Sequence, residues 1–434
     1  MNQIKVVVLT LMALVSNGLA QTPAASAGKP NIIFILADDL GYGDVHCLNP
    51  QRGKIKTPNL DRLAAQGMTF TDAHDVASVC TPSRYGLLTG RYAWRSRLSK
   101  GVLDGYLPPL IAPDRLTVAG LLQQHGYYTA CIGKWHLGFT IEGANKFGVK
   151  PGAPNPPKEM GAPLGAVTTN GPTTRGFDLF YGFHHARMMK SVFENDRVAQ
   201  IIEPVNMLPA LVKRASEFIA SRTSTDKPFF LYFALNSPHT PIVPSAQWQG
   251  KSGLGDYGDF VMETDWAVGQ VLEALDKAGV ADNTLVIFSS DNGCSRAAGI
   301  KGLEAKGHYP SGPFRGSKSD IWDGGHRVPF FVRWPGKVEA GSHSSQLISL
   351  ADFMATCAGV LDVKLPANAG EDSVNLLPAL FGNDQGTLRE GIVYHSIEGR
   401  FGIQQGRWKL ELCPGSGGWS EPKDATATRQ GLLP

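Results

Sequence analysis

The sequence predicts an α/β fold in which a large, mostly parallel central sheet is sandwiched between helices. Three observations lead to this prediction. Four short stretches of continuous apolar residues occur along the chain, amphipathic helical patterns lie between them, and each stretch ends in a cluster of polar residues. Continuous rather than alternating apolarity is typical of strands that are buried on both faces, as in a parallel sheet covered by helices.

The predicted central strands are the apolar runs at residues 32–37, 128–132, 229–235 and 285–288. The polar clusters that follow them are, in order, Asp38-Asp39, Gly133-Lys134-Trp135-His136, Asn236-Ser237-Pro238-His239 and, after two serines, Asp291-Asn292. In open parallel sheets, ligands bind beyond the carboxyl ends of the strands. We therefore expect one edge of the sheet to gather the acids, the lysine and both histidines.

Three helices are predicted between these strands from apolar residues that recur every three or four positions. The first begins at Thr57-Pro58 and ends before Gly67, the second includes residues 208–219, and the third covers residues 261–275 and ends near Gly279. Proline near a helix start and glycine just after a helix end are the usual boundary signals.

A further helix is predicted directly after Cys80. We expect Thr81 to cap it and Pro82 to occupy its first position, where a missing N–H costs nothing, and we expect Gly90 to end it. Cys80 would then face free backbone N–H groups and the positive end of a helix dipole, with Arg84 one turn later. Such a place suits an anionic centre. The alternative is a buried structural cysteine, which is the usual state of a lone cysteine.

The gross composition limits the classes of function. The chain has 434 residues, which is enough for a large core and for more than one structural unit. Its net charge is only +3 and it has no long Lys/Arg run, so a nucleic-acid partner is not expected. The six cysteines are scattered without a CxxC pair, which supports neither a zinc site nor a disulfide scaffold.

The N-terminus is typical of a secretory signal peptide at residues 1–20. Lys5 gives a positive start, residues 6–15 form a short apolar core, and Gly18-Leu19-Ala20 offers small residues for cleavage before Gln21. The apolar core is too short to span a bilayer, and no later segment is long and apolar enough to do so. We therefore predict an exported protein, periplasmic or secreted, without a membrane span.

Two of the polar clusters are a candidate metal site. Asp38, Asp39, Asp291 and Asn292 offer hard oxygen donors, which suit Ca²⁺ or Mg²⁺ rather than zinc. Adjacent acids in a partly buried cleft repel each other, and a divalent cation removes that repulsion. The alternative is that these are ordinary loop residues that cap the following turns.

Two motifs resemble the signatures of one enzyme family. The first motif resembles the signature of the formylglycine-dependent sulfatases and consists of Cys80-x-Pro82-Ser83-Arg84, continued by Leu88-Thr89-Gly90. The second motif resembles the second signature of that family and covers residues 126–136 (GYYTACIGKWH). The resemblance runs from about Asn31 to the region of Trp408. It implies an alkaline-phosphatase-type fold and an arylsulfatase-like sulfuric ester hydrolase, and the short signal peptide and compact length suggest a bacterial enzyme.

The resemblance also implies the chemistry of the site. Cys80 would be oxidised to formylglycine by a formylglycine-generating enzyme; one hydroxyl of the aldehyde hydrate would attack sulfur and the second would expel sulfate. The implied metal is one Ca²⁺ ion, although the residues alone also allow Mg²⁺, and its implied ligands are Asp38, Asp39, residue 80, Asp291 and Asn292. The other implied roles are that Arg84 holds the hydrate, Lys134 neutralises the sulfate, His136 takes a proton from the second hydroxyl, His239 protonates the leaving oxygen and Lys318 grips the sulfate.

Several further residues are candidate substrate contacts: His74, Asp104, His184, His185, Arg187, Trp322, Asp323 and His326. Residues 322–327 follow Lys318 closely and are expected to line the pocket. The alternatives are that His184-His185 belongs to a surface loop and that Asp323 only orients its neighbours.

The family implies a sulfated carbohydrate as substrate, with a small aryl sulfate as an assay substrate. A phosphomonoester or phosphonate hydrolase of the same superfamily is the alternative enzyme. A binding protein for sulfated glycans that has lost catalysis is a less favoured alternative, because the nucleophile and all the metal ligands are present in the sequence.

The chain is expected to divide after the signal peptide into a catalytic α/β domain at residues 21–387 and a small C-terminal subdomain at residues 388–434. Two strands are expected in the subdomain, at residues 391–397 and 401–412, around a turn at Glu398-Gly399-Arg400. Compared with the family, this subdomain is expected to be short or truncated. Gly/Pro-rich loops at residues 151–172 and 301–316 are candidate binding loops.

Overall fold

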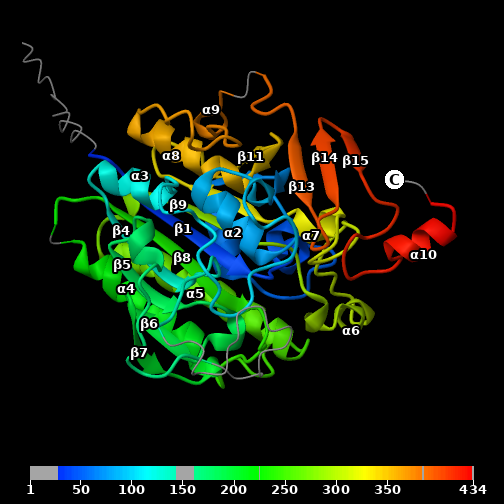
Figure 1. Ribbon diagram of the computed structural model, residues 1–434, viewed down its shortest axis with the longest axis horizontal. Helices are drawn as coiled ribbons and strands as arrows, with labels where there is room; N and C mark the ends of the chain where they lie inside the picture. Colours follow the sequence, from blue (N-terminus) through cyan, green and yellow to red (C-terminus); the bar gives the residue numbers. More distant parts are fainter. Residues whose placement is uncertain (1–27, 143–160, 224, 384–385, 433–434) are drawn as a thin grey trace, which may run out of the picture.

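A ten-stranded sheet forms the centre of the molecule (Figure 1). The computed structural model describes residues 28–142, 161–223, 225–383 and 386–432, so the predicted signal peptide and part of the first predicted loop lie outside the described residues. The strands of this sheet are β1 (Asn31–Asp38), β2 (Met68–Phe70), β4 (Tyr128–Lys134), β5 (Leu179–Phe183), β6 (Ser191–Glu194), β7 (Arg197–Ile201), β8 (Phe229–Pro238), β9 (Thr284–Ser290), β10 (Phe330–Arg333) and β11 (Ser342–Ser344).

The strand order in the large sheet is β11-β2-β10-β9-β1-β8-β4-β5-β6-β7. β9, β1, β8, β4 and β5 are all parallel, whereas β10 at one side and β6 and β7 at the other pair antiparallel. The predicted fold class is therefore confirmed, and the four predicted strands are the four adjacent strands at the middle of the sheet. Their shared direction brings all four carboxyl ends to one edge.

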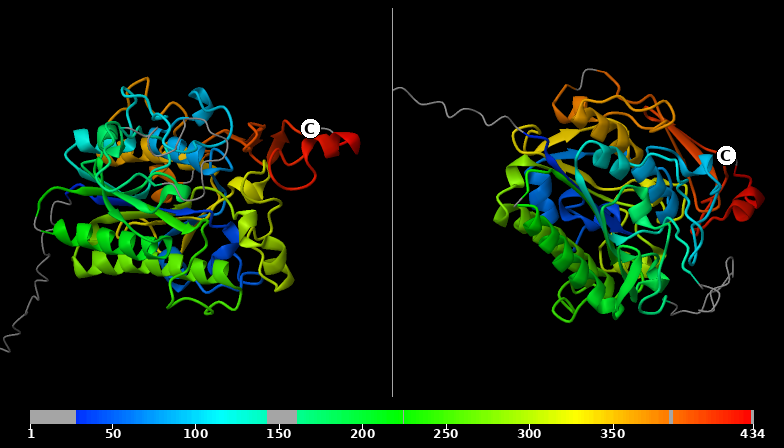
Figure 2. Two further views of the ribbon diagram at one scale, coloured as in Figure 1. Left: turned by 60° about the horizontal axis from the view of Figure 1, so that its bottom comes forward. Right: turned by 60° about the vertical axis from the view of Figure 1, so that its left-hand side comes forward.

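Helices cover both faces of the sheet. They are α1 (Pro58–Ala65), α2 (Cys80–Thr89), α3 (Val118–Gln124), α4 (Met207–Ser221), α5 (Asp256–Lys277), α6 (Ile300–Ala305), α7 (Asp323–His326), α8 (Phe353–Leu361), α9 (Leu377–Leu380) and α10 (Asp424–Arg429). Figure 2 shows α4 and α5 lying along one face of the sheet, with α2, α3 and α8 on the opposite face. The three helices predicted between the strands correspond to α1, α4 and α5.

The residues of β1 show how the sheet is buried on both sides. Phe34 and its alternate neighbours pack into a core with α2, α3 and α8, whereas Ile33 and Ile35 pack into a second core with α1, α4 and α5. All residues of β1 are buried. The continuous apolar run thus reflects two cores, since alternate side chains of a strand point to opposite faces.

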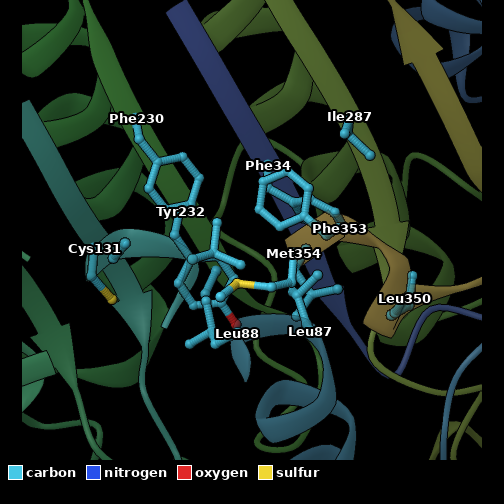
Figure 3. Packing of buried hydrophobic residues seen from close by; sticks show 14 of the residues in the cluster. Phe34, Leu87, Leu88, Cys131, Phe230, Tyr232, Ile287, Leu350, Phe353 and Met354 are labelled. Carbon is cyan, nitrogen blue, oxygen red and sulfur yellow. The ribbon is translucent and has the colours of Figure 1, made fainter. Parts of the chain in front are cut away.

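Helix α2 is fixed on the first of these cores. Leu87 and Leu88 pack with Phe34, Tyr232 and Met354 (Figure 3). The helix begins at Cys80 after Val79, and Gly90 ends it in the left-handed conformation. The predicted end is confirmed, but the predicted start was two residues too late.

The helix begins earlier than predicted because Thr81 and Pro82 belong to the first turn of α2. Proline is tolerated there, since the first four N–H groups of a helix have no partner inside it. The hydroxyl of Thr81 accepts a hydrogen bond from the backbone N–H of Leu103 instead of capping the helix. Cys80 is consequently the first residue of α2 rather than a residue before it.

Two smaller sheets complete the part of the chain that the structure describes. β3 (Ala73–His74) pairs with β12 (Ile348–Ser349), and β13 (Ile392–His395), β14 (Phe401–Gln405) and β15 (Trp408–Glu411) form an antiparallel sheet near the C-terminus. The prediction of one strand at residues 401–412 was wrong, because Gly406 adopts a positive φ of 55° and the chain turns back there. The predicted loop at residues 301–316 also begins inside α6.

The structure bears on disulfide bonds and on membrane-spanning helices. All six cysteines are free. In the part of the chain that the structure describes, every helix is too short or too polar to cross a bilayer.

Candidate active site

The carboxyl ends of the four central strands gather a cluster of buried polar side chains. Asp38 ends β1 and Asp39 follows it, Lys134 ends β4, and Asp291 and Asn292 follow β9. α2 adds Cys80 and Arg84, and the loop after α6 adds Lys318. We call these eight residues the strand-end cluster. Residues more than 250 positions apart meet here because parallel strands end at the same edge of the sheet.

Three hydrogen-bonded ion pairs balance the charges of the strand-end cluster. Lys134 Nζ donates to Asp38 Oδ2 at 2.6 Å, Lys318 Nζ donates to Asp39 Oδ1 at 2.5 Å, and Arg84 Nε and Nη2 donate to Asp291 Oδ2 at 2.9 and 2.7 Å. All six side chains are buried. Three carboxylates therefore face three cations, which is the condition under which buried charges are tolerated.

The neighbouring cations keep the carboxylates ionised. Burial alone would raise the pKa of Asp38, but Lys134 and other nearby cationic groups lower it below its ordinary value. The pKa of Asp39 is likewise lowered in spite of its burial, mainly by Lys318. In return, Asp39 raises the pKa of Lys318 against the opposite effect of burial. Asp38 and Asp39 are therefore ionised at neutral pH, and Lys318 is protonated.

Two oxygen atoms of the strand-end cluster lack a hydrogen-bond partner. Asp38 Oδ1 and Asn292 Oδ1 are both fully buried. The amide of Asn292 is oriented by its nitrogen, which donates to Asp39 Oδ1 at 2.8 Å. Buried oxygens without donors are rare in folded proteins and point to an absent ligand. One ligand atom from each of Asp38, Asp39, Cys80 and His239 lies within 4.8 Å of the others, so these donors are close enough to share one cation.

Cys80 lies at the N-terminus of α2, and its Sγ is 3.4 Å from Nζ of Lys318. Its side chain is buried, and burial raises the pKa of the thiol to about 11 although Lys134 and Lys318 oppose the shift. The unmodified thiol is consequently protonated at neutral pH and is a weak nucleophile.

His136 presents an unpaired ring nitrogen. Its Nε2 lies 2.8 Å from the carbonyl oxygen of Leu103, so Nε2 carries the proton and donates it. Nδ1 is buried and has no partner. Burial, together with His185 and Lys134, lowers the pKa of His136 well below its ordinary value, so Nδ1 is a bare acceptor. The backbone of His136 has a φ of 55°, an uncommon conformation for a non-glycine residue.

His239 lies beyond the end of β8 and faces the acids of β1. Its Nδ1 donates to the carbonyl oxygen of Thr240 at 2.6 Å, and its Nε2 is 3.7 Å from Asp39 Oδ2. Burial lowers the pKa of this ring, although Asp38 and Asp39 oppose the shift. The ring thus holds Nε2 toward the cluster, where it can exchange a proton.

A cavity of about 890 Å³ opens above the strand-end cluster. Six of the predicted site residues line this cavity: Cys80, His136, His185, Arg187, His239 and Lys318. Asp104 lies next to this wall, where its carboxylate pairs with Arg187 at 3.2 Å. His184 is completely buried behind His136, with its ring centroid 6.2 Å from that of His136. Of the strand-end cluster, Cys80 and Lys318 line the cavity, and its other lining residues come from segments outside the strands.

Four other predicted contacts lie away from this cavity, and three of them belong to a group beside the C-terminal sheet. We call His74, Asp72, Asp323, His326 and Lys409 the joint cluster. His74 Nδ1 and His326 Nδ1 lie 2.9 Å apart, His74 Nε2 is 2.8 Å from Asp72, and Lys409 of β15 binds Asp323. Trp322 is also turned from the cavity, under the guanidinium of Arg315 at 3.5 Å.

These contacts explain why the expectation for residues 322–327 does not match the cavity. Neither Trp322, Asp323 nor His326 lines it, and His326 is buried with its ring stacked on Tyr394 at 3.9 Å. Proximity to Lys318 in sequence did not predict position because residues 323–326 form α7, in which His326 stacks on Tyr394 and Asp323 binds Lys409.

The cavity wall contains residues that the sequence reasoning missed. Trp419 and Arg296 line it from the C-terminal tail and from the segment after β9. The tail from Pro414 is polar and rich in glycine. A single tryptophan within residues 415–420, a stretch of glycine and serine, was the available signal, because a loop of small polar residues has no core in which to bury an indole.

Comparisons with known proteins agree with this geometry. A sequence family described as Sulfatase matches residues 30–363. The N-acetylgalactosamine-6-O-sulfatase of Bacteroides thetaiotaomicron is 34% identical over 92% of this chain and 84% of its own length, and the steryl-sulfatase of Homo sapiens is 32% identical over 87% and 74%. A solved 6S-sulfatase from a study of the metabolism of multiple glycosaminoglycans by Bacteroides thetaiotaomicron superposes with a TM-score of 0.76 at 31% identity, covering 88% of each chain.

Proposed function

The chain belongs to the sulfatase family, whose members are sulfuric ester hydrolases, and from this premise we propose that it removes sulfate from a sulfated saccharide. The observation that carries the proposal is Cys80 at the floor of the cavity, 3.4 Å from Lys318 and beside three charge-balanced acids. The names of the bacterial relatives make 6-O-sulfated N-acetylgalactosamine, as found in glycosaminoglycans, the first substrate to test.

The residues present fit one divalent cation, which we propose to be Ca²⁺. Asp38, Asp39, Asp291 and Asn292 are hard oxygen donors, and two of their buried oxygens have no partner. Residue 80 would complete the ligand set. When bound, the cation would make a hydroxyl on residue 80 more acidic and would balance the charge of the sulfate group. The lysines that now pair with Asp38 and Asp39 would then be free to contact the sulfate oxygens.

We propose that Cys80 is oxidised to formylglycine before the enzyme is active. The raised pKa of its thiol supports this, because the protonated thiol is poorly suited to attack sulfur. Oxidised to the aldehyde and hydrated, residue 80 would supply one hydroxyl that attacks sulfur and a second that permits sulfate release. A formylglycine-generating enzyme is therefore the proposed maturation partner.

The remaining residues of the cluster have roles that follow from their positions. Arg84 donates to the carbonyl oxygen of Lys134 at 2.9 Å as well as to Asp291, so it fixes β4 relative to the metal ligands. Lys134 and Lys318 are compact cations suited to sulfate oxygens. His136 can accept a proton at its bare Nδ1. His239 can deliver a proton from Nε2 to the leaving oxygen once its ring is protonated, a state that Asp38 and Asp39 favour.

We also propose that the protein is exported, with residues 1–20 as a signal peptide that is removed before the protein reaches the periplasm or the medium. Within the remainder, we propose a catalytic unit at residues 21–387 and a C-terminal subdomain at 388–434. The mass of the purified mature protein checks the cleavage point after Ala20, and a mature protein that still begins at Met1 contradicts it.

The experiment for the main proposal combines mass spectrometry with turnover. The peptide that contains residue 80 is analysed for the aldehyde, and the same preparation is assayed on N-acetylgalactosamine 6-sulfate, nitrophenyl sulfate and nitrophenyl phosphate. We expect aldehyde at residue 80 and faster release of sulfate than of phosphate. Higher turnover of the phosphate ester supports the alternative phosphomonoesterase, and an oxidised residue 80 with ligand binding but no sulfate release supports a non-catalytic glycan-binding protein.

A further inference from the structure

The C-terminal tail places an aromatic side chain on the wall of the cavity. Trp419 is half-buried and lines the cavity together with Cys80 and Lys318, although it lies 101 residues after Lys318 in the sequence. It belongs to the segment Ser416–Ser420, which we call the Trp419 loop. An indole at the wall of a cavity is a large apolar surface in contact with water, which favours a ligand that covers the ring.

The Trp419 loop is fixed by Asp320, whose side chain is buried in the loop that carries Lys318. Asp320 Oδ1 accepts hydrogen bonds from the backbone N–H groups of Trp419 and Ser420, both at 2.9 Å, and Oδ2 accepts from the N–H of Ser317 at 2.9 Å. A second acceptor for the N–H of Trp419 is Ser319 Oγ at 2.9 Å. The tryptophan is therefore held rigidly relative to Lys318.

Close backbone contact strengthens this arrangement. A side chain at Gly418 would place its Cβ only 2.3 Å from the carbonyl oxygen of Ser319, so only glycine allows the two loops to approach this closely. The backbone N–H of Ile321 also donates to the carbonyl oxygen of Ser416 at 2.8 Å. These contacts fix the Trp419 loop as part of the cavity wall.

Positive charge lies beside the tryptophan. The guanidinium of Arg296 is 5.0 Å from the ring centroid of Trp419, and both residues line the cavity. Arg296 is exposed and lies in a short segment that follows Asp291 and Asn292. In the same cavity, Arg187 pairs with Asp104. The guanidinium thus lies over the indole ring at the wall of the cavity.

We propose that Trp419 and Arg296 form an outer subsite for a second sugar residue, one that carries its own anionic group. This inference rests on the proposed function and specifies its substrate. The C–H face of the sugar would pack on the indole, and its uronic-acid carboxylate or second sulfate would pair with the guanidinium. The cavity of about 890 Å³ leaves room for this, since a single sulfated sugar at the floor fills only part of a volume near the upper end of the usual range of ligand sites.

The chain offers a matched control elsewhere. Arg407 lies 5.0 Å from the ring centroid of Trp408, the same arrangement as Arg296 and Trp419, but neither residue lines the cavity. Trp408 is 71% exposed on β15. Trp408→Ala and Arg407→Gln therefore remove an equivalent aromatic and cationic pair without touching the proposed subsite.

The test compares kcat/KM on three substrates: N-acetylgalactosamine 6-sulfate alone, the same unit linked to a uronic acid, and the same unit linked to a neutral hexose. We expect Trp419→Ala to lower kcat/KM for both disaccharides by about tenfold more than for the monosaccharide. We expect Arg296→Gln to act on the uronic-acid disaccharide alone, by about threefold to fivefold at low salt and less at high salt. The variants at Trp408 and Arg407 should match the wild type.

Equal losses on all three substrates would overturn the subsite, because they would show that Trp419 only supports the Lys318 loop. Identical behaviour of Trp419→Ala and Trp408→Ala would also overturn it. Binding of the unsulfated uronic-acid disaccharide is measured in parallel by calorimetry, with Trp419→Ala expected to weaken it by about tenfold. This separates the two proposals: wild-type protein that binds this disaccharide through Trp419 but releases no sulfate contradicts the proposed function and supports the subsite.

Discussion

The strand-end cluster and the joint cluster are both groups of buried ionisable side chains, and the loop from Ser317 to Arg327 contributes to each. Lys318 near the start of this loop enters the strand-end cluster, and His326 near its end enters the joint cluster. The two clusters differ in how their polar atoms are satisfied. In the strand-end cluster Asp38 Oδ1 and Asn292 Oδ1 have no hydrogen-bond partner, and the cluster opens to a cavity. Each ring nitrogen of the two joint histidines, in contrast, has a polar neighbour within 3.0 Å.

This difference separates a site from a structural joint. By residue type either cluster could hold a metal ion, since His74, Asp323 and His326 also bring three ligand atoms within 4.8 Å of one another. In the joint cluster, however, Lys409 already binds Asp323, and the side chains link β3, α7 and β15. Unpaired buried oxygens beside a cavity indicate a ligand, whereas a fully paired network holds secondary-structure elements together.

Removal of the residue 80 side chain should have the largest effect. We expect Cys80→Ala to lower kcat by at least about a thousandfold, because no nucleophile remains at the floor of the cavity. Steady-state sulfate release measures the effect, and circular dichroism checks the fold. Cys131→Ala, in the buried part of β4, is the control for loss of a buried thiol. Near-native turnover in Cys80→Ala would remove residue 80 from the mechanism.

Metal affinity should distinguish the two clusters directly. We expect Asp291→Asn to weaken Ca²⁺ binding by about 100-fold, because an anionic oxygen is lost from the proposed ligand set. The amide keeps the volume of the side chain and an oxygen for the N–H of Asp39, which donates to Asp291 Oδ1 at 3.2 Å. Metal content after dialysis against a series of free Ca²⁺ concentrations measures the change.

The control for the metal experiment is Asp323→Asn in the joint cluster. Its affinity for Ca²⁺ should equal that of the wild type, since Lys409 already neutralises Asp323. Loss of Ca²⁺ in Asp323→Asn with no loss in Asp291→Asn would reverse the assignment of the two clusters.

The same contrast shows what could be predicted from the sequence. Apolar runs that end in polar residues predicted the four central strands, and the parallel arrangement then placed Asp38, Lys134, His239 and Asp291 at one edge. That inference worked because residues beyond the ends of parallel strands must lie close together. The two motifs around Cys80 and His136 added the helix and the histidine that complete the floor of the cavity.

Loops could not be predicted in the same way. Trp419 reaches the cavity only because Asp320 binds the backbone of the tail, and this contact between residues about 100 positions apart has no periodic pattern. Asp323 and His326 were expected in the pocket because they are close to Lys318 in sequence, but α7 places His326 against Tyr394 and Asp323 against Lys409. Tertiary contacts between loops therefore decided which residues form the walls.

The joint cluster should affect stability rather than chemistry. We expect His326→Ala to lower the free energy of unfolding by about 2 kcal/mol, because it leaves a cavity under Tyr394 and removes the partner of His74. Chemical unfolding followed by tryptophan fluorescence measures this, and the exposed His343 of β11 provides a control substitution to alanine. A loss of kcat per folded molecule comparable to that of Cys80→Ala would contradict the separation of the two clusters.

His184 allows a pH experiment that isolates burial from hydrogen bonding. The ring is completely buried, neither nitrogen has a partner, and burial lowers its pKa to about 3 from 6.5, with a further contribution from Lys134. Between pH 6.5 and 3 the unfolded chain therefore binds a proton that the folded protein does not. Stability must rise with pH in this window and fall as the pH drops through it, by up to about 1.4 kcal/mol per pH unit for this one ring.

His184→Phe should remove this contribution. The phenyl ring fits the aromatic surroundings, since Phe139 and Tyr106 lie 4.8 and 5.7 Å from the imidazole centroid. We expect the variant to lose stability less steeply than the wild type between pH 6.5 and 4.5, and to show a similar slope above pH 7.5, where His184 is neutral in both the folded and the unfolded chain. Urea unfolding at several pH values gives both slopes. Equal slopes below pH 6.5 would mean that His184 takes up its proton in the folded protein. Burial alone would then not keep this ring neutral behind His136. The contrast between the strand-end cluster and the joint cluster would in that case rest on the unpaired oxygens of Asp38 and Asn292.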